Sequence, residues 1–172
     1  MVSLIYMSTK AFTLIELLVV VAIIGILAAV GVVAYNGYTG AAKVNVTKAN
    51  HKTVVSFLNS TFMLANVNGG FFINSMSTKN NCQPQDIRTF PASVSKVMNN
   101  MVRHLRCVIT IHPFDSSNKY PIDYGPRKTK GSVEFWNRCT NGKPIIHIET
   151  IYNDSGDKLA DSIDITEFGG RC

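Results

Sequence analysis

The chain has 172 residues, a formal net charge of +6 and four cysteines. Once a long apolar segment near the amino terminus is set aside, roughly 130 residues remain, which excludes several large domains and leaves room for one of modest size. The positive charge is compatible with nucleic acid or anionic lipid as a partner. A solvated basic surface explains the charge as well and is the more common case.

A long apolar run follows a short leader of residues 1–11. No charged side chain occurs from Leu17 to Tyr35. A helix needs about 20 apolar residues to cross a bilayer, so residues 12–35 are predicted to form a transmembrane or filament-core helix. An ordinary secretory signal is the competing interpretation. This run is longer than the apolar core of such signals, and Glu16 lies inside it.

The start of this run, AFTLIE after the basic leader MSTK, resembles the amino-terminal signature of type IV pilins and pseudopilins. The resemblance covers residues 7–45. It implies that a prepilin peptidase cuts between Ala11 and Phe12, and that the new amino group of Phe12 is then methylated. Ala11 stands where this family usually has glycine. Translation from Met7 would give a tidier leader than translation from Met1.

Glu16 is a carboxylate within the apolar run. A carboxylate at hydrocarbon depth is costly, so such a residue is functional by default and needs a partner. The resemblance implies that the partner is the charged terminal amine of Phe12 on a neighbouring subunit. Such a pair would neutralise both charges and set the axial register between subunits. The alternative is that Glu16 reaches the lipid headgroups.

Residues 36–66 are predicted to continue the same helix as an amphipathic half. Its apolar stripe recurs at helical spacing and suits packing under a sheet: Val44, His51, Val55, Leu58, Phe62 and Ala65. A histidine on such a stripe is more often packed with satisfied hydrogen bonds than a ligand. The Asn- and Gly-rich residues 66–70 are predicted to end the helix after Ala65.

Residues 67–172 are predicted to form a globular head. Residues 66–90 have the composition of a loop, and Pro91 is predicted to open a second helix. Alternation of apolar and polar residues predicts strands at residues 106–112, 132–139, 144–152 and 159–168, with a loop at residues 113–131. Asn141-Gly142 is a hairpin signal. The predicted fold class is therefore α+β, with a long amino-terminal helix packed on a carboxyl-terminal antiparallel sheet.

All four cysteines follow the apolar run, which indicates disulfides in an oxidising compartment. Four cysteines allow three pairings, and the sequence does not choose among them. The resemblance favours a bridge between Cys139 and Cys172 near the carboxyl terminus, and with it a bridge between Cys82 and Cys107. Because no CxxC pair occurs, a thiolate zinc site is not expected.

Few residues outside the amino-terminal segment point to chemistry. Arg127, Lys128 and Lys130 form a basic loop that would attract DNA phosphates, although an exposed soluble loop has the same composition. The oxygen-rich turn at residues 153–161 lacks the spacing of a calcium loop, so a solvated acidic turn is favoured. No motif of a serine hydrolase, zinc peptidase or nucleotide-binding loop occurs. We therefore expect no cofactor, no metal and no enzymatic activity.

These features predict a structural subunit of a bacterial type IV pilus or pilus-like filament. Before assembly it would span the inner membrane, with its leader in the cytoplasm and its head in the periplasm. The pilus assembly machinery would then build it into a homo-oligomeric helical filament at the cell surface. The alternatives are a pseudopilin of a type II secretion system, a minor pilin for DNA uptake or adhesion, and a membrane-anchored periplasmic enzyme.

Overall fold

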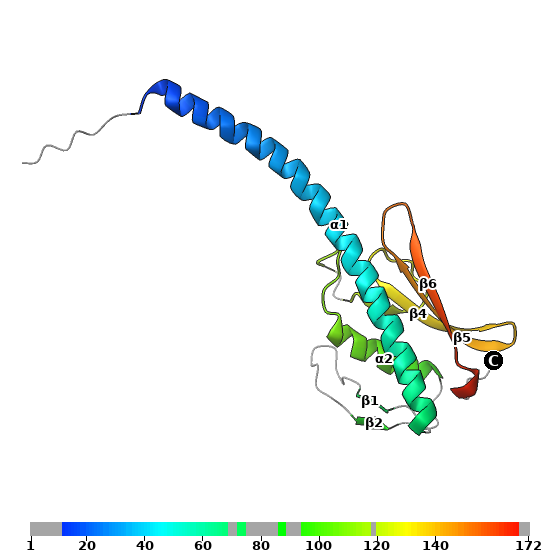
Figure 1. Ribbon diagram of the computed structural model, residues 1–172. Helices are drawn as coiled ribbons and strands as arrows, with labels where there is room; N and C mark the ends of the chain where they lie inside the picture. The colour runs from blue at the N-terminus through cyan, green and yellow to red at the C-terminus, as the bar shows by residue number, and fades with distance from the viewer. Residues whose placement is uncertain (1–11, 69–71, 75–85, 89–93, 118–119, 169–172) are drawn as a thin grey trace, which may run out of the picture. The chain divides into compact units, whose positions relative to one another are not determined.

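One long helix opens the fold in the computed structural model, which describes residues 12–68, 72–74, 86–88, 94–117 and 120–168. Helix α1 runs from Leu14 to Asn68 (Figure 1). It contains no proline and it continues through Gly25 and Gly31, since a glycine inside a helix costs only about 1 kcal/mol relative to alanine. The helix extends beyond the end predicted at Ala65.

Helix α1 is divided between two compact units, residues 1–41 and residues 42–172. We therefore describe its first part, residues 14–41, and its second part, residues 42–68, separately. Side chains of the first part are almost all exposed within the chain. The second part carries a buried stripe, which consists of Thr47, His51, Val54, Leu58, Thr61, Phe62 and Ala65. Val54 takes the buried position predicted for Val55, which is only half-buried.

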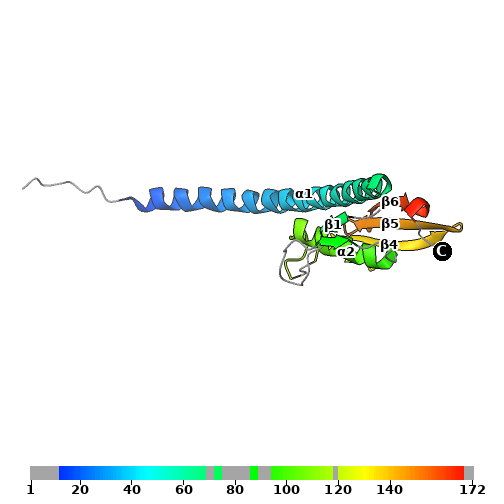
Figure 2. The same ribbon diagram turned by 90° about the horizontal axis from the view of Figure 1, so that it is seen from below.

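Four strands form the main sheet in the order β3-β4-β5-β6. They are β3 (Ile122–Tyr124), β4 (Val133–Thr140), β5 (Lys143–Ile151) and β6 (Lys158–Asp164). Figures 1 and 2 label β4, β5 and β6. Strands β4, β5 and β6 are antiparallel neighbours, whereas β3 is parallel to β4. Both Asn141 and Gly142 have positive φ, at 52° and 75°, as a two-residue hairpin turn between β4 and β5 requires. The sheet is therefore mostly antiparallel, with one parallel edge strand.

One hydrophobic core joins the second part of α1, the helix α2 (Val94–Val108) and one face of the sheet. Leu58 and Phe62 come from α1, and Met101 and Leu105 come from α2. The sheet contributes the alternate residues of its strands: Ile122, Val133, Phe135, Ile146 and Ile148. Because side chains alternate between the two faces of a strand, the apolar residues that face the helices could be predicted from sequence.

The strand predicted at residues 106–112 is wrong. Helix α2 continues to Val108, and the N–H of Ile109 still donates to the carbonyl of Leu105 over 2.8 Å. Met101, Leu105 and Ile109 are buried at helical spacing, whereas Ile111 is 77% exposed. The period of the helix therefore prevails over the apparent alternation of the cysteine and isoleucines in this segment.

Short strands were also missed within the predicted loops. Strands β1 (Phe72–Asn74) and β2 (Asp86–Arg88) form a separate antiparallel pair inside residues 66–90, and β3 lies inside residues 113–131. Three residues are too few to show alternation, so strands this short are recognised from their hydrogen-bonded pairing in the structure and not from the sequence pattern. The last predicted strand is too long, because β6 ends at Asp164 and a 3₁₀ turn, η1 (Thr166–Phe168), follows.

Candidate functional site

The amino-terminal end of α1 is closed by reciprocal hydrogen bonds between Thr13 and Glu16. The N–H of Thr13 donates to Glu16 Oε2 over 2.8 Å, and the N–H of Glu16 donates to Thr13 Oγ1 over 3.3 Å. The Thr13 hydroxyl also donates to Glu16 Oε2 over 2.7 Å. This arrangement is a capping box, which satisfies N–H groups that the first turn of a helix leaves unpaired.

The cap gives Glu16 a polar partner within its own chain. The sequence predicts a partner for Glu16 on a neighbouring subunit or among the lipid headgroups, and the prediction omits Thr13, although a Thr followed three residues later by a Glu before an apolar run is the signal of a capping box. Ala11, on one side of the predicted cleavage site, lies outside the described residues, and Phe12 is exposed. The pairing of Glu16 with the amine of a neighbouring Phe12 remains a prediction.

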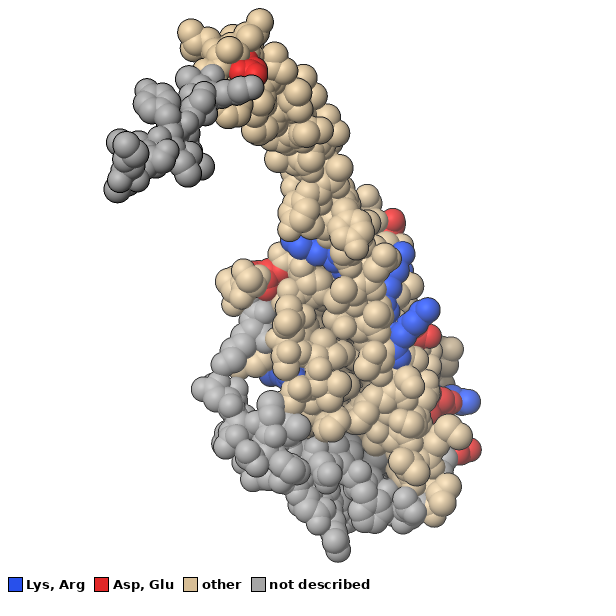
Figure 3. Space-filling view, turned by 60° about the vertical axis from the view of Figure 1, so that its left-hand side comes forward, with Lys and Arg blue, Asp and Glu red and all other residues tan. Residues whose placement is uncertain are grey.

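The first part of α1 presents an apolar surface that is exposed among the described residues. Its large exposed side chains include Leu17, Val20, Ile24, Leu27 and Val33. The face seen in Figure 3 is free of charge along this segment except for a carboxylate at its amino-terminal end. The helix is long and apolar enough to cross a membrane. An exposed apolar surface of this extent marks a membrane or protein contact.

His51 ties the second part of α1 to the sheet. Its ring is 2% exposed, and Nε2 lies 2.8 Å from Asp161 Oδ2 on β6 while Nδ1 lies 2.9 Å from Thr150 Oγ1 on β5. A carboxylate only accepts hydrogen bonds, so Nε2 carries the hydrogen and donates it to Asp161. The Thr150 hydroxyl then donates to Nδ1 of the neutral ring or accepts from the protonated one. Both ring nitrogens are satisfied, as predicted for a packed histidine.

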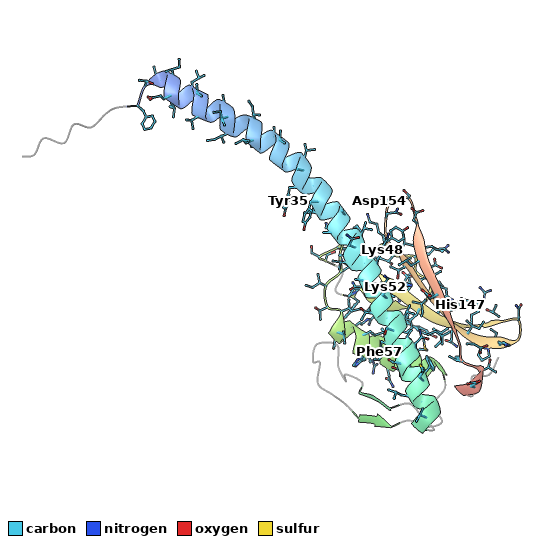
Figure 4. The ribbon with its side chains drawn as sticks, viewed as in Figure 1. Tyr35, Lys48, Lys52, Phe57, His147 and Asp154 are labelled. Carbon is cyan, nitrogen blue, oxygen red and sulfur yellow. The ribbon has the colours of Figure 1, made fainter. Side chains whose placement is uncertain are left out.

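Two further contacts hold the second part of α1 in place. Lys48 Nζ lies 4.1 Å from the centre of the Tyr152 ring, and the rings of Phe57 and His104 stack with centroids 4.8 Å apart. Figure 4 shows Lys48, Lys52 and Phe57 along this part of the helix. Thus α1 contacts both α2 and the end of β5 through Phe57 and Lys48. The helical period of the sequence does not predict either contact.

The basic loop is neutralised in part by neighbouring carboxylates. Arg127 Nη1 lies 2.9 Å from Asp123 Oδ2, and the ammonium of Lys130 pairs with Asp154. The backbone N–H groups of Lys128 and its neighbour Thr129 each donate over 2.7 Å to the carboxylate of Glu134. The exposed Lys128 side chain has no carboxylate partner among the described residues. Arg127, Lys128 and Lys130 therefore lie on one well-held loop but offer less net charge than their sequence suggests.

Glu134 on β4 is a buried carboxylate. The alternation of β4 assigns it to the face opposite Val133 and Phe135, yet it is buried. Its burial follows from the loop of residues 128–129, whose N–H groups it accepts, because a buried carboxylate is tolerated only when it is hydrogen-bonded. The alternation of the strand alone does not predict that a loop covers this face of β4.

The acidic turn and the cysteines take part in other contacts. Asp154 pairs with Lys130, Asp161 with His51, and Asp157 accepts from the side chain of Asn153 over 2.9 Å. Cys107 and Cys139 are both disulfide-bonded. Cys82 and Cys172 lie outside the described residues, so the predicted pairing of the four cysteines stays a prediction.

Comparison with known proteins identifies the amino-terminal segment. Residues 6–32 match the prokaryotic N-terminal methylation motif. No curated protein and no solved structure is significantly similar to the chain. The match includes the Thr13–Glu16 cap and most of the apolar first part of α1, whereas the sheet lies outside it.

The chain therefore carries the type IV pilin and pseudopilin signature. Its long helix, followed by a mostly antiparallel sheet, is an α+β, pilin-like fold. The motif supports a pilin-like or pseudopilin precursor and indicates a structural subunit. An apolar helix near the amino terminus fits insertion into a membrane.

Proposed function

We propose that this protein is the structural subunit of a bacterial type IV pilus or pilus-like filament. The observation that carries the proposal is the methylation motif at residues 6–32, which overlaps the first part of α1, whose apolar side chains are exposed among the described residues. Lipid would cover this surface before assembly, and the helices of neighbouring subunits would cover it in the filament. Packing would then replace lipid contacts, so extraction from the membrane needs little hydrophobic free energy.

Processing would prepare the subunit for assembly. A prepilin peptidase would cut between Ala11 and Phe12, and the new amine of Phe12 would be methylated. Glu16 would then pair with this amine on a neighbouring subunit. The capping bonds from Thr13 support this role, because they hold the Glu16 carboxylate at the first turn of the helix, close in sequence to the new terminus.

Intact mass with amino-terminal fragmentation, on protein from native membranes or sheared filaments, tests the processing. The expected chain begins at methylated Phe12 and is lighter by two hydrogens for each disulfide. A chain that begins at Met1 or Met7, or one cut after the apolar run, would contradict the proposal. It would leave an anchored or secreted domain instead.

The substitution Glu16→Gln tests assembly apart from processing. It removes one negative charge and keeps the size of the side chain, so the processed subunit should accumulate in the membrane while sheared filaments are lost. The matched control is Glu167→Gln, which removes the same charge from the exposed turn η1 and should leave filaments intact. Normal filaments with Glu16→Gln would show that the intersubunit pair is not needed.

A pseudopilin of a type II secretion system is the second candidate, because it shares the leader and the helix. Its filament would stay in the periplasm, whereas a pilus would extend from the cell surface. Antibody labelling of intact cells distinguishes the two, with surface filaments expected for the pilus. Label that appears only after the outer membrane is permeabilised would favour the pseudopilin.

A minor pilin for DNA uptake or adhesion is the third candidate, supported by the basic loop alone. Replacement of Arg127, Lys128 and Lys130 by glutamine should abolish DNA binding and leave filaments unchanged if the loop contacts phosphates. Because Arg127 and Lys130 already face carboxylates, Lys128 should contribute most of the effect. DNA binding that survives the triple substitution would remove this candidate.

A further inference from the structure

His112 is a second buried histidine, and it lies between α2 and β3, outside the contact of α1 with the sheet. Its ring is 5% exposed, and Nδ1 accepts two backbone hydrogen bonds, from Phe114 over 3.2 Å and from Asp115 over 2.9 Å. A ring nitrogen that accepts two N–H bonds carries no hydrogen, so the hydrogen of the neutral ring is on Nε2. Nε2 lies 3.2 Å from Ser132 Oγ, next to the start of β4.

The ring packs against the backbone at Gly131. A Cβ atom at this position would lie 2.9 Å from His112 Cε1 and 2.7 Å from Phe114 Cδ2, and φ is +85°. The close approach therefore requires glycine. The N–H of Gly131 donates to the carbonyl of Ile151 over 2.8 Å, at the end of β5. The imidazole thus joins the turn of residues 112–115 to the segment of residues 130–132 that leads into β4.

Two charged groups lie near this turn. Asp115 lies on the same turn, and the ammonium of Lys130 lies 4.2 Å from the centre of the Phe114 ring and pairs with Asp154 on the turn after β5. Burial lowers the pKa of His112, and Asp115 and the backbone of Lys130 oppose this effect only in part. The site therefore favours the neutral ring.

We propose that His112 is a pH-sensitive latch, which holds the turn of residues 112–115 against residues 130–132 at neutral pH and releases it in acid. A proton on Nδ1 would face the two backbone N–H donors, so both hydrogen bonds would be lost and a charge would remain in a buried site. Release would separate the Phe114 ring from Lys130 and so change the surface beside the basic loop. The latch depends on the surroundings of His112 alone and stands apart from the proposed filament function.

The direction of the pH dependence follows from the pKa of His112. Because the fold favours the neutral ring, the latch is fully stable above the ordinary histidine value of 6.5 and weakens as the pH falls below it, toward the lower pKa of the folded state. Between these two pKa values each pH unit shifts the equilibrium from the closed to the open form by up to about tenfold.

Nuclear magnetic resonance of the full chain in detergent micelles tests the latch directly. At pH 7.5 the ¹⁵N shifts of His112 should show the tautomer with hydrogen on Nε2. From pH 7 to pH 5 the protection factors of the Phe114 and Asp115 amides, which compare the intrinsic with the observed exchange rate, should fall about tenfold. The protection factors of the Ile146 and Ile148 amides should stay unchanged. A hydrogen on Nδ1 at pH 7.5, or unchanged protection at pH 5, would overturn the proposal.

The substitution His112→Asn separates the proton from the hydrogen bonds. The amide oxygen of asparagine can take the place of Nδ1 as acceptor but gains no proton in this range, so the turn should stay closed at both pH values. The matched control is His147→Asn on β5, which should keep the wild-type response. A pH response in His112→Asn equal to that of wild type would assign the effect to another group and overturn the proposal. If this variant does not fold, the tautomer and the amide exchange of the wild-type chain still test the latch.

Discussion

The two parts of helix α1 contain similar apolar residues in different surroundings. Leu27 in the first part is 66% exposed, whereas Leu58 in the second part is 0% exposed beneath the sheet. The first part lacks charge after Glu16 until Lys43, and the second part alternates its buried stripe with lysines and polar residues. One continuous helix therefore serves two environments. The second part packs in the core of the head, and the first exposes an apolar surface of the kind that marks a membrane or protein contact.

Two matched leucine substitutions should separate these environments most strongly. Leu58→Ala removes a fully buried side chain from the core and should destabilise the head by about 2–5 kcal/mol, because it leaves a cavity. Leu27→Ala removes the same atoms from an exposed position and should leave head stability unchanged. Urea unfolding of the full chain in detergent, followed by the fluorescence of the single tryptophan, Trp136, measures both. Equal effects of the two changes would contradict the division of the helix.

The contact of His51 with the sheet gives a smaller expected effect. His51→Leu should cost about 1–3 kcal/mol, because it leaves the buried Thr150 hydroxyl without its partner. Asp161→Ala should cost less, since the Asp161 side chain is half exposed and water can replace it. Lys52→Leu, at the next and exposed position of the helix, is the control and should change stability by less than about 0.5 kcal/mol. The same unfolding experiment ranks the three losses of stability. A His51→Leu variant as stable as wild type would show that this contact has no structural role.

Glycine substitutions should give the smallest effect. A Cβ atom at Gly25 would meet nothing within 4 Å in the chain, so Gly25→Ala should stabilise the helix locally by about 1 kcal/mol. Gly156→Ala also has open space, but φ is +81° there, so the opposite sign is expected in the turn after β5. Amide exchange around each site in micelles measures the difference. Faster exchange around Gly25→Ala would show that this part of the helix already has neighbours that the isolated chain lacks.

The success of sequence reasoning along the chain follows the range of the interactions involved. The apolar run, the stripe through Leu58 and the Asn141-Gly142 turn are local patterns, and each appears in the structure. The Thr13–Glu16 cap is local too, and its Thr-x-x-Glu spacing is a signal that the sequence contains but the prediction did not use. The strand at residues 106–112 failed because a short alternating segment at the end of a helix satisfies both periods.

The amino-acid sequence by itself determined the apolar helix, the processing motif and the α+β order of elements, since each depends on residues close together in the chain. Only the tertiary structure decided the pairing of His51 with Asp161, which are 110 residues apart, the burial of Glu134 and the two N–H bonds on His112. The physical reason is that a buried polar group persists only where the fold supplies a partner. Such partners come from distant strands and loops, and no periodic pattern records them.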